Sequence, residues 1–203
     1  MIAAVVLAAG AARRMGRPKQ LLPLAGRPLV WHVASAACRS VVDEVIVVTG
    51  ARRTAVAAAV AGLSVRLAPN PRWRSGQASS LQAGLNAVSP DTGAIIFLLA
   101  DQPLVTPALL DSLAAAYRAG GGSIVAPVAG GRRGNPVLFD IARWRQQLLA
   151  LTGDAGARAI IAAHPGQVAA VPVTDETVFF DVDTPADYEE IIRLYQTINS
   201  GGA

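Results

Sequence analysis

The stretch MIAAVVLAAGAARRMGRPK at residues 1–19 places an apolar run directly before a loop of small and basic residues. Residues 2–8 are apolar throughout rather than alternating, which is typical of a strand in a parallel sheet covered on both faces. The run has no positive n-region and is short for a signal peptide, so a buried first strand is the better interpretation. Ligands of open parallel sheets bind beyond the carboxyl ends of the strands, where the loop after residue 8 would lie.

Apolar runs of strand length alternate with helical patterns along most of the chain. Strands are predicted at 2–8, 44–49, 65–68, 94–99, 123–127, 137–139, 168–172 and 178–182. Helices are predicted at 28–39, 54–61, 80–88, 106–119, 143–150, 155–163 and 185–198, with Thr106 and Thr184 as amino-terminal caps. A Gly/Arg loop is expected at 130–134. This order predicts one three-layer, Rossmann-like α/β domain at 1–198, with a mostly parallel central sheet and a flexible tail at 199–203.

Composition narrows the class of protein. Of 203 residues, 52% are hydrophobic and 16% charged, which excludes a disordered chain. The longest near-continuous apolar run, 94–100, is too short to cross a bilayer. The one cysteine, Cys38, can form no internal disulfide, so we expect a cytoplasmic protein without membrane association.

Charge is divided unevenly along the chain, which carries a net charge of +4. Residues 1–74 hold 11 basic side chains and 2 acidic ones, whereas residues 75–203 hold 7 basic and 12 acidic ones. A basic half facing an acidic half suits a cleft for a phosphorylated small molecule and a divalent cation. The 10 aromatic residues are scattered, so nucleic-acid binding is not expected.

The loop after the first predicted strand favours phosphate binding. Its small residues let backbone N–H groups approach a phosphate closely, and Arg14 and Lys19 can neutralise the charge. Lys19 is the only lysine among 18 basic residues. The loop fits neither the Walker A pattern nor Gly-x-Gly-x-x-Gly, since Gly10 and Gly16 are six residues apart. A glycine-rich turn with solvated arginines remains the alternative.

Motifs along most of the chain resemble one family. They are LAAGxxxRMGxxK at 7–19, QLLPLAGRPL at 20–29, NPxWxxGxxxSL at 70–81, DQP at 101–103, RGNPVLF at 133–139, GDxGAR at 153–158 and DxDTPxDY at 181–188. In this order they resemble the molybdenum cofactor cytidylyltransferases, relatives of molybdopterin-guanine-dinucleotide synthases. Ala12 departs from the resemblance, because the family usually has serine or threonine there.

The resemblance implies a nucleotidyltransferase fold and a reaction. CMP would pass from CTP to the terminal phosphate of the molybdenum-pterin cofactor, releasing pyrophosphate, with Mg²⁺ as cofactor and a molybdenum hydroxylase as possible recipient. Ala9, where guanylyl relatives typically have glycine, points to CTP. The implied catalytic residues are Arg14, Lys19 and Asp101.

The resemblance also implies binding residues. The nucleotide contacts would be Ala8, Ala9, Gly10, Arg14, Lys19, Gly76 and Ser80. Acceptor contacts would come from Arg133, Asn135, Asp154 and Arg158. The alternative for Arg133 and Asn135 is a solvated loop, and the alternative for Asp154 and Arg158 is an ion pair at the start of a helix.

Two aspartates are the predicted magnesium ligands. Asp101 and Asp183 each follow a predicted strand, and acids at the tips of separate strands can converge on one cation. A capping role for Asp183 is the alternative, and Asp181 or Asp187 fits the spacing equally well. The resemblance favours Asp101 and Asp183.

Three other functions are considered. The first is guanylyl or other nucleotidyl transfer to a different phosphorylated acceptor. The second is non-catalytic delivery of the molybdenum cofactor. The third is an NAD(P)-dependent oxidoreductase, whose expected dinucleotide fingerprint the chain lacks.

Overall fold

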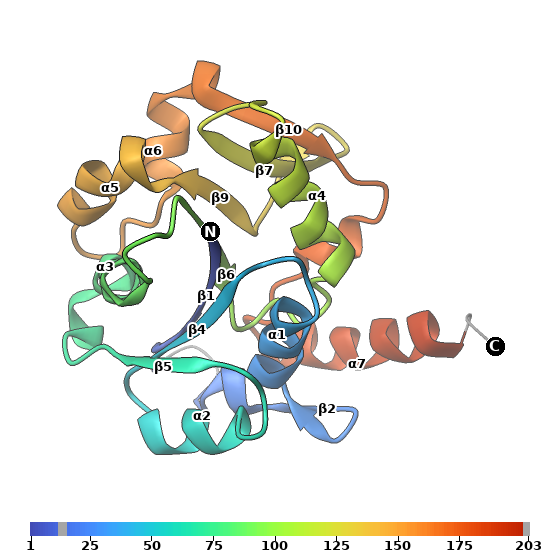
Figure 1. Ribbon diagram of the computed structural model, residues 1–203. Coiled ribbons are helices and arrows are strands. Elements are labelled where there is room, and N and C mark those ends of the chain that lie inside the picture. The colour runs from blue at the N-terminus through green and yellow to red at the C-terminus, as the bar shows by residue number, and fades with distance from the viewer. Residues whose placement is uncertain (12–15, 201–203) are drawn as a thin grey trace.

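The computed structural model describes residues 1–11 and 16–200, built around an eight-stranded sheet (Figure 1). The strands are β1 (Ile2–Ala8), β4 (Glu44–Thr49), β5 (Arg66–Pro69), β6 (Ala94–Leu99), β7 (Ile124–Ala129), β8 (Arg132–Arg133), β9 (Val137–Asp140) and β10 (Val168–Pro172). Their order is β10-β7-β9-β6-β1-β4-β5, with β8 paired to β7 outside this path. β1 is parallel to both of its neighbours, β4 and β6. The predicted mostly parallel sheet is confirmed.

β9 is the strand that breaks the parallel arrangement. It runs antiparallel to β6 and to β7, whereas β10 is again parallel to β7. Val137 of β9 lies opposite Phe97 of β6, so the residues just before β9 lie beside the carboxyl end of β6. The predicted loop 130–134 contains the short strand β8, and it leads the chain to the edge where ligands bind.

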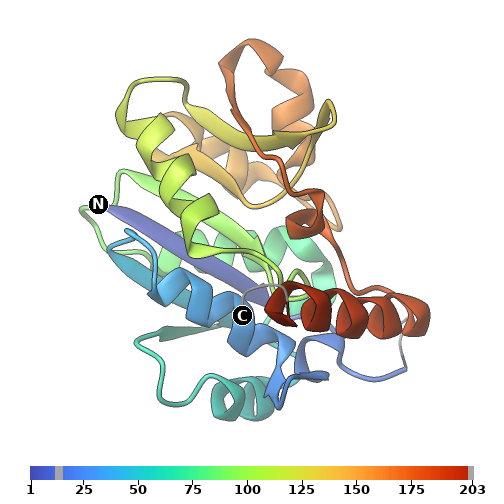
Figure 2. The same cartoon turned by 90° about the vertical axis from the view of Figure 1, so that its right-hand side faces the viewer.

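Helices cover both faces of the sheet, which gives the three predicted layers (Figures 1 and 2). One face carries α1 (Leu29–Cys38), α2 (Arg53–Ala59) and α4 (Pro107–Arg118), and the other carries α3 (Gln77–Ala87), α5 (Ile141–Ala150) and α6 (Arg158–Ala163). Successive side chains of a strand point to opposite faces. Val6 therefore packs in the cluster of α1 and α4, while Val5 packs in the cluster of α3 and α5.

A third cluster joins the end of the chain to its beginning. The hairpin β2 (Pro23–Leu24) and β3 (Arg27–Pro28) lies close to α7 (Pro185–Ser200), and Leu24 and Ile191 are buried together (Figure 2). The predicted cap of α7 is confirmed, because the Asp187 backbone N–H donates to Thr184 Oγ1 at 3.2 Å. In return, Asp187 Oδ2 accepts from the Thr184 N–H at 2.7 Å, so Asp187 serves the helix start.

The boundaries of most elements lie within three residues of the prediction. Thr106 caps α4 as expected, accepting from Leu109 N–H at 3.2 Å. α3 and α6 differ most, beginning at residues 77 and 158 rather than 80 and 155. α7 ends at residue 200 rather than 198, and the division between a domain at 1–198 and a tail stays a prediction. No helix in the described ranges is long and apolar enough to cross a membrane.

The strand predicted at 178–182 is wrong. Residues Glu176–Phe179 form a 3₁₀ helix, and the chain then continues to residue 184 without strand pairing. Val178 and Val182 are buried, but in two different clusters. Their apolar character therefore reflects the burial of a connecting segment rather than a place in the sheet. This segment nevertheless reaches the sheet edge, since the Val182 N–H donates to the Asp101 carbonyl at 3.1 Å.

Glu44 ties the amino edge of the sheet together and generates a prediction about acid stability. Its carboxylate accepts from Ser89 N–H at 2.8 Å, Thr92 Oγ1 at 2.9 Å and Arg66 Nη2 at 2.6 Å. Burial raises the pKa of Glu44, but these hydrogen bonds together outweigh it, and the pKa lies below the ordinary value of 4.5. Its contribution to stability is therefore present above pH 4.5 and lost as the pH falls through the folded-state pKa.

We expect Glu44→Gln to lower the free energy of unfolding by about 1–3 kcal/mol near neutral pH. The difference from the unmodified protein should shrink as the pH falls from 4.5 through the lower folded-state pKa, because the carboxylate is protonated first in the unfolded state and then in the folded state. Urea denaturation at pH 7, 5, 4 and 3 measures this. Glu189→Gln, at an exposed position of α7, is the matched control. A difference that stays constant down to pH 3 would contradict the prediction.

Candidate functional site

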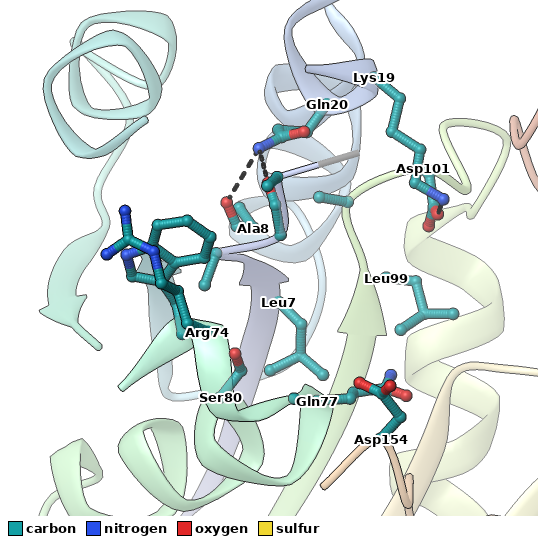
Figure 3. Close-up of a pocket in the computed structure, with 16 residues that line it drawn as sticks. Leu7, Ala8, Lys19, Gln20, Arg74, Gln77, Ser80, Leu99, Asp101 and Asp154 are labelled. Atoms are coloured by element: carbon teal, nitrogen blue, oxygen red, sulfur yellow. Dashed lines mark hydrogen bonds and ion pairs between the residues drawn. The ribbon is translucent and has the colours of Figure 1, made fainter. Parts of the chain in front are cut away.

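A cavity of about 440 Å³ opens at the carboxyl edge of the sheet, beyond β1 and β6 (Figure 3). Five segments line it: residues 7–11, 19–20, 73–80 and 99–101, and Asp154. Ala8, Ala9, Gly10, Lys19, Gly76 and Ser80, all predicted to bind the nucleotide, are among the lining residues. Arg14, predicted to bind the nucleotide and to act in catalysis, lies outside the described residues.

One end of the cavity holds an ammonium group between two carboxylates. Lys19, at the start of the 3₁₀ turn η2 (Lys19–Leu21), forms ion pairs with Asp101 and with Asp183, the second at 2.6 Å from Nζ to Oδ1. Burial lowers the pKa of Lys19, but the Asp101 and Asp183 carboxylates outweigh it and raise the pKa above 10.5. Lys19 is therefore protonated at physiological pH, and three segments far apart in sequence meet at its charge.

The two predicted metal ligands are thus neighbours, although Asp183 does not follow a strand as predicted. Asp101 follows β6 as expected, whereas Asp183 stands at the end of an irregular segment just before α7. Within residues 1–11 and 16–200, no group of three or more His, Cys, Asp or Glu side chains is arranged to hold a metal ion. The protein itself offers two carboxylates at this place.

Asp181 is a third carboxylate beside this pair. Burial raises the pKa of Asp181 to about 6, and the negative charge of Asp101 contributes to the shift. The spacing Asp-x-Asp at 181–183 had made Asp181 an alternative to Asp183 as metal ligand. In the structure it is Asp183 that contacts Lys19.

Gln20 holds the loop after β1 in place. Its side-chain amide is buried and donates to the Gly10 carbonyl at 2.9 Å and to the Ala8 carbonyl at 3.3 Å. The Ala9 carbonyl accepts from the Ala51 N–H at 3.1 Å. The carbonyls of residues 8–10 are therefore all engaged by the protein itself. Gln20 stood in the quoted motif at 20–29, but the sequence alone assigned it no role, because its hydrogen bonds to backbone carbonyls appear only in the structure.

Asn70 organises the opposite wall of the cavity. Its side chain is buried, donates to Ser79 Oγ at 2.9 Å and Ser80 Oγ at 3.1 Å, and accepts from the Arg72 N–H at 2.9 Å. Ser80 is thereby fixed where it lines the cavity. Asn70 stood in a quoted motif, but only the structure reveals this role.

Trp73 and Arg74 form a stacked pair on the same wall. The Arg74 guanidinium lies 4.2 Å from the centre of the Trp73 ring, and both side chains line the cavity. This is a cation–π arrangement, and Arg74 stands at the wall of the cavity in Figure 3.

The four predicted acceptor contacts do not lie together. Asp154 lines the cavity, whereas Arg133, Asn135 and Arg158 do not. Arg133 belongs to β8, and Asn135 lies just before β9, beside the end of β6. Arg158 is exposed at the start of α6. An acceptor role for this set stays a prediction.

We expect Asn70→Ala to lower the free energy of unfolding by about 1–3 kcal/mol, because buried hydroxyl and N–H groups lose their partner. Urea denaturation measures the change. Asn86→Ala removes an exposed asparagine from α3 and should alter stability by at most about 0.5 kcal/mol. Equal effects of the two substitutions would show that Asn70 does not organise the wall.

Comparisons with known proteins agree with this fold. Residues 4–170 match the MobA-like NTP transferase domain. The nicotine blue oxidoreductase of Paenarthrobacter nicotinovorans is 35% identical over 199 residues, covering 95% of this chain and 96% of that protein. The chain also spans 28% of the length of the bifunctional protein GlmU of Sorangium cellulosum, with 35% identity over 133 residues.

Two solved structures are similar over nearly their whole length. Rv0371c from Mycobacterium tuberculosis H37Rv has a TM-score of 0.84 and 31% identity, covering 95% of this chain and 97% of that one. It has also been crystallised in a complex with manganese. A nucleotidyl transferase from Methanothermobacter, Mth528, has a TM-score of 0.83 and 28% identity, covering 98% and 99%. The chain is therefore a member of the MobA-like NTP transferase family.

Proposed function

We propose that the protein transfers CMP from CTP to the terminal phosphate of the molybdenum-pterin cofactor and releases pyrophosphate. The observation that carries this proposal is the Lys19 ammonium between Asp101 and Asp183 at the end of a cavity. Nucleotidyl transfer needs charge stabilisation around an α-phosphate, and this end of the cavity supplies it. The sequence resemblance supports CTP and the pterin acceptor as the substrates.

The chain's own residues suffice to orient the reactants. The loop 8–10 offers a small-residue surface for the triphosphate, and Lys19 stabilises its negative charge. An oxygen of the acceptor phosphate forms a bond to the α-phosphorus, and the bond from that phosphorus to the bridging oxygen breaks, so that the electron pair leaves with pyrophosphate. No side-chain nucleophile is required, because the acceptor phosphate is already anionic.

Magnesium fits the donor set of this site. Asp101 and Asp183 already converge on one cationic group, and Mg²⁺ is commonly held by one or two carboxylates together with water and substrate phosphates. When bound, the ion would neutralise charge on the triphosphate. The manganese complex of Rv0371c supports a divalent cation in this family member as well.

A second candidate function is a nicotinamide-dependent oxidoreduction. It is favoured by the 35% identity to a nicotine blue oxidoreductase along nearly the full chain. The chain, however, has no Gly-x-Gly-x-x-Gly fingerprint, and the charged end of the cavity has no evident use in hydride transfer. We therefore rank it second.

We expect Asp101→Asn to reduce pyrophosphate release by about 10²–10³-fold, because one charged group at the reacting phosphate is lost. Single-turnover assays with CTP and the pterin cofactor at saturating Mg²⁺ measure this. Binding of Mn²⁺, followed by electron paramagnetic resonance in the presence of CTP, should weaken in parallel. Asp91→Asn, an exposed carboxylate before β6 at the other edge of the sheet, is the control.

The proposal also predicts the nucleotide itself. Calorimetric titration with CTP, GTP, ATP and UTP in the presence of Mg²⁺ should give the highest affinity for CTP. A preference for GTP would move the reaction to guanylyl transfer. Binding and oxidation of NADPH without pyrophosphate release would favour the second candidate function.

A further inference from the structure

The rim of the cavity carries a carboxylate that lies apart from the charged end formed by Lys19 and Asp101. Asp154 lines the cavity together with Gln77, and the two side chains lie beside each other in Figure 3. Leu7 and Leu99 lie between this pair and the charged end formed by Lys19 and Asp101 (Figure 3). Within residues 1–11 and 16–200, no side chain or backbone group pairs with the Asp154 carboxylate. Asp154 and Gln77 are both exposed, so their polar groups are open to solvent and to a ligand in the cavity.

The rim is held in place by close backbone contacts. The Ala78 N–H donates to the Gly153 carbonyl at 3.1 Å, which ties the segment before α6 to the start of α3. Gly76 has φ +102°, and a Cβ there would lie 2.2 Å from the Gly153 carbonyl carbon, so only glycine allows this approach. A Cβ at Gly156 would lie 3.0 Å from Gln77 Oε1. Asp154 and Gln77 are thus presented by segments that pack against each other.

The chemistry of these two groups limits what they can bind. A carboxylate only accepts hydrogen bonds, and it repels the phosphates of a nucleotide or of a phosphorylated acceptor. The part of the ligand beside Asp154 must therefore carry N–H or O–H donors. The Gln77 amide adds an acceptor and two donors. An amino group with a neighbouring ring nitrogen matches this combination, because the carboxylate accepts from the amino group and the amide donates to the ring nitrogen.

The remaining walls suit a planar ring. The planar Trp73 ring and the Arg74 guanidinium stacked on it line the cavity, and Leu7 and Leu99 are apolar. We propose that Asp154 and Gln77 form a subsite that recognises the amino-bearing edge of a nitrogen heterocycle in the ligand. This inference rests on the proposed function, in which both the nucleobase and the pterin acceptor are amino-substituted heterocycles.

The test compares ligands that differ only in this edge. CTP carries an amino group where UTP carries a carbonyl oxygen, and that oxygen would face the Asp154 carboxylate as a second acceptor. We expect the unmodified protein to bind CTP about 10- to 100-fold more tightly than UTP, as for one hydrogen bond to a charged group. Asp154→Asn, which offers a donor as well as an acceptor, should reduce this ratio to about threefold or less.

The measurement is calorimetric titration of the full chain with each nucleotide and Mg²⁺. Gln77→Leu should weaken CTP binding with a smaller effect on UTP. Asp91→Asn removes an exposed carboxylate outside the cavity and should leave the CTP-to-UTP ratio unchanged. Melting temperatures of all variants show whether each one folds.

A kinetic measurement then shows whether the recognised heterocycle belongs to the nucleotide or to the pterin acceptor. If Asp154→Asn leaves nucleotide affinity unchanged but raises the KM for the pterin acceptor about tenfold or more, the subsite recognises the acceptor. Unchanged nucleotide affinity together with an unchanged KM overturns the inference. An equal loss of CTP and UTP binding also overturns it, because the carboxylate would then not read the base edge. Failure of the unmodified protein to bind any nucleoside triphosphate overturns the proposed function itself.

Discussion

The pairing of Lys19 with Asp101 and Asp183 is the interaction on which the arrangement of this site depends. It joins the turn after the first loop, the end of β6 and the start of α7, which are separated by more than 80 residues along the chain. Three carboxylates, Asp101, Asp181 and Asp183, lie near one another, and without the ammonium their mutual repulsion would be uncompensated. Lysine has three N–H donors, and two of them serve the carboxylates. Among residues 1–11 and 16–200, no other group pairs with the Lys19 ammonium, so its third donor can meet a ligand in the cavity.

The sheet order explains why these groups meet at one edge. β1 and β6 are parallel neighbours, so the loop after β1 and Asp101 after β6 emerge side by side. The antiparallel strand β9 begins near this same edge and runs away from it, and the segment before α7 closes the site through the hydrogen bond from the Val182 N–H to the Asp101 carbonyl. The cavity is thus formed by several chain segments that meet at the carboxyl edge of one sheet, rather than by a separate substrate domain.

Sequence patterns located the strands that are buried on both faces of the sheet, but they wrongly predicted a strand in one irregular segment with buried valines. Strands 2–8 and 94–99 are apolar along their length because both faces of the sheet are covered, and they were located correctly. Val178 and Val182 show the same apolar signal, but they are buried in two different clusters on an irregular segment. Periodicity cannot distinguish these cases.

The site residues that could be predicted from the sequence are those with a distinctive charge or with a position directly after a strand. Lys19 and Asp101 stand out by residue type and by their place after strands, and the structure brings them together. Gln20 and Asn70 act through buried hydrogen bonds to backbone and hydroxyl groups of segments remote in sequence. These roles depend on contacts between segments that are distant in sequence, so no spacing of residues along the sequence indicates them. The resemblance grouped Asp154 with Arg158 as acceptor contacts, but Asp154 lines the cavity whereas Arg158 does not.

Membership of the MobA-like family establishes the fold of the protein more firmly than its reaction. A relative that is 35% identical over 95% of the chain carries the name of an oxidoreductase, so the fold alone does not choose between group transfer and hydride transfer. The choice rests on what the cavity stabilises. Hydride transfer moves charge between two rings and gains little from two carboxylates and an ammonium at one end of the cavity. Phosphoryl chemistry concentrates negative charge at one phosphorus centre, and an ammonium held between two carboxylates at the end of a cavity can stabilise such charge.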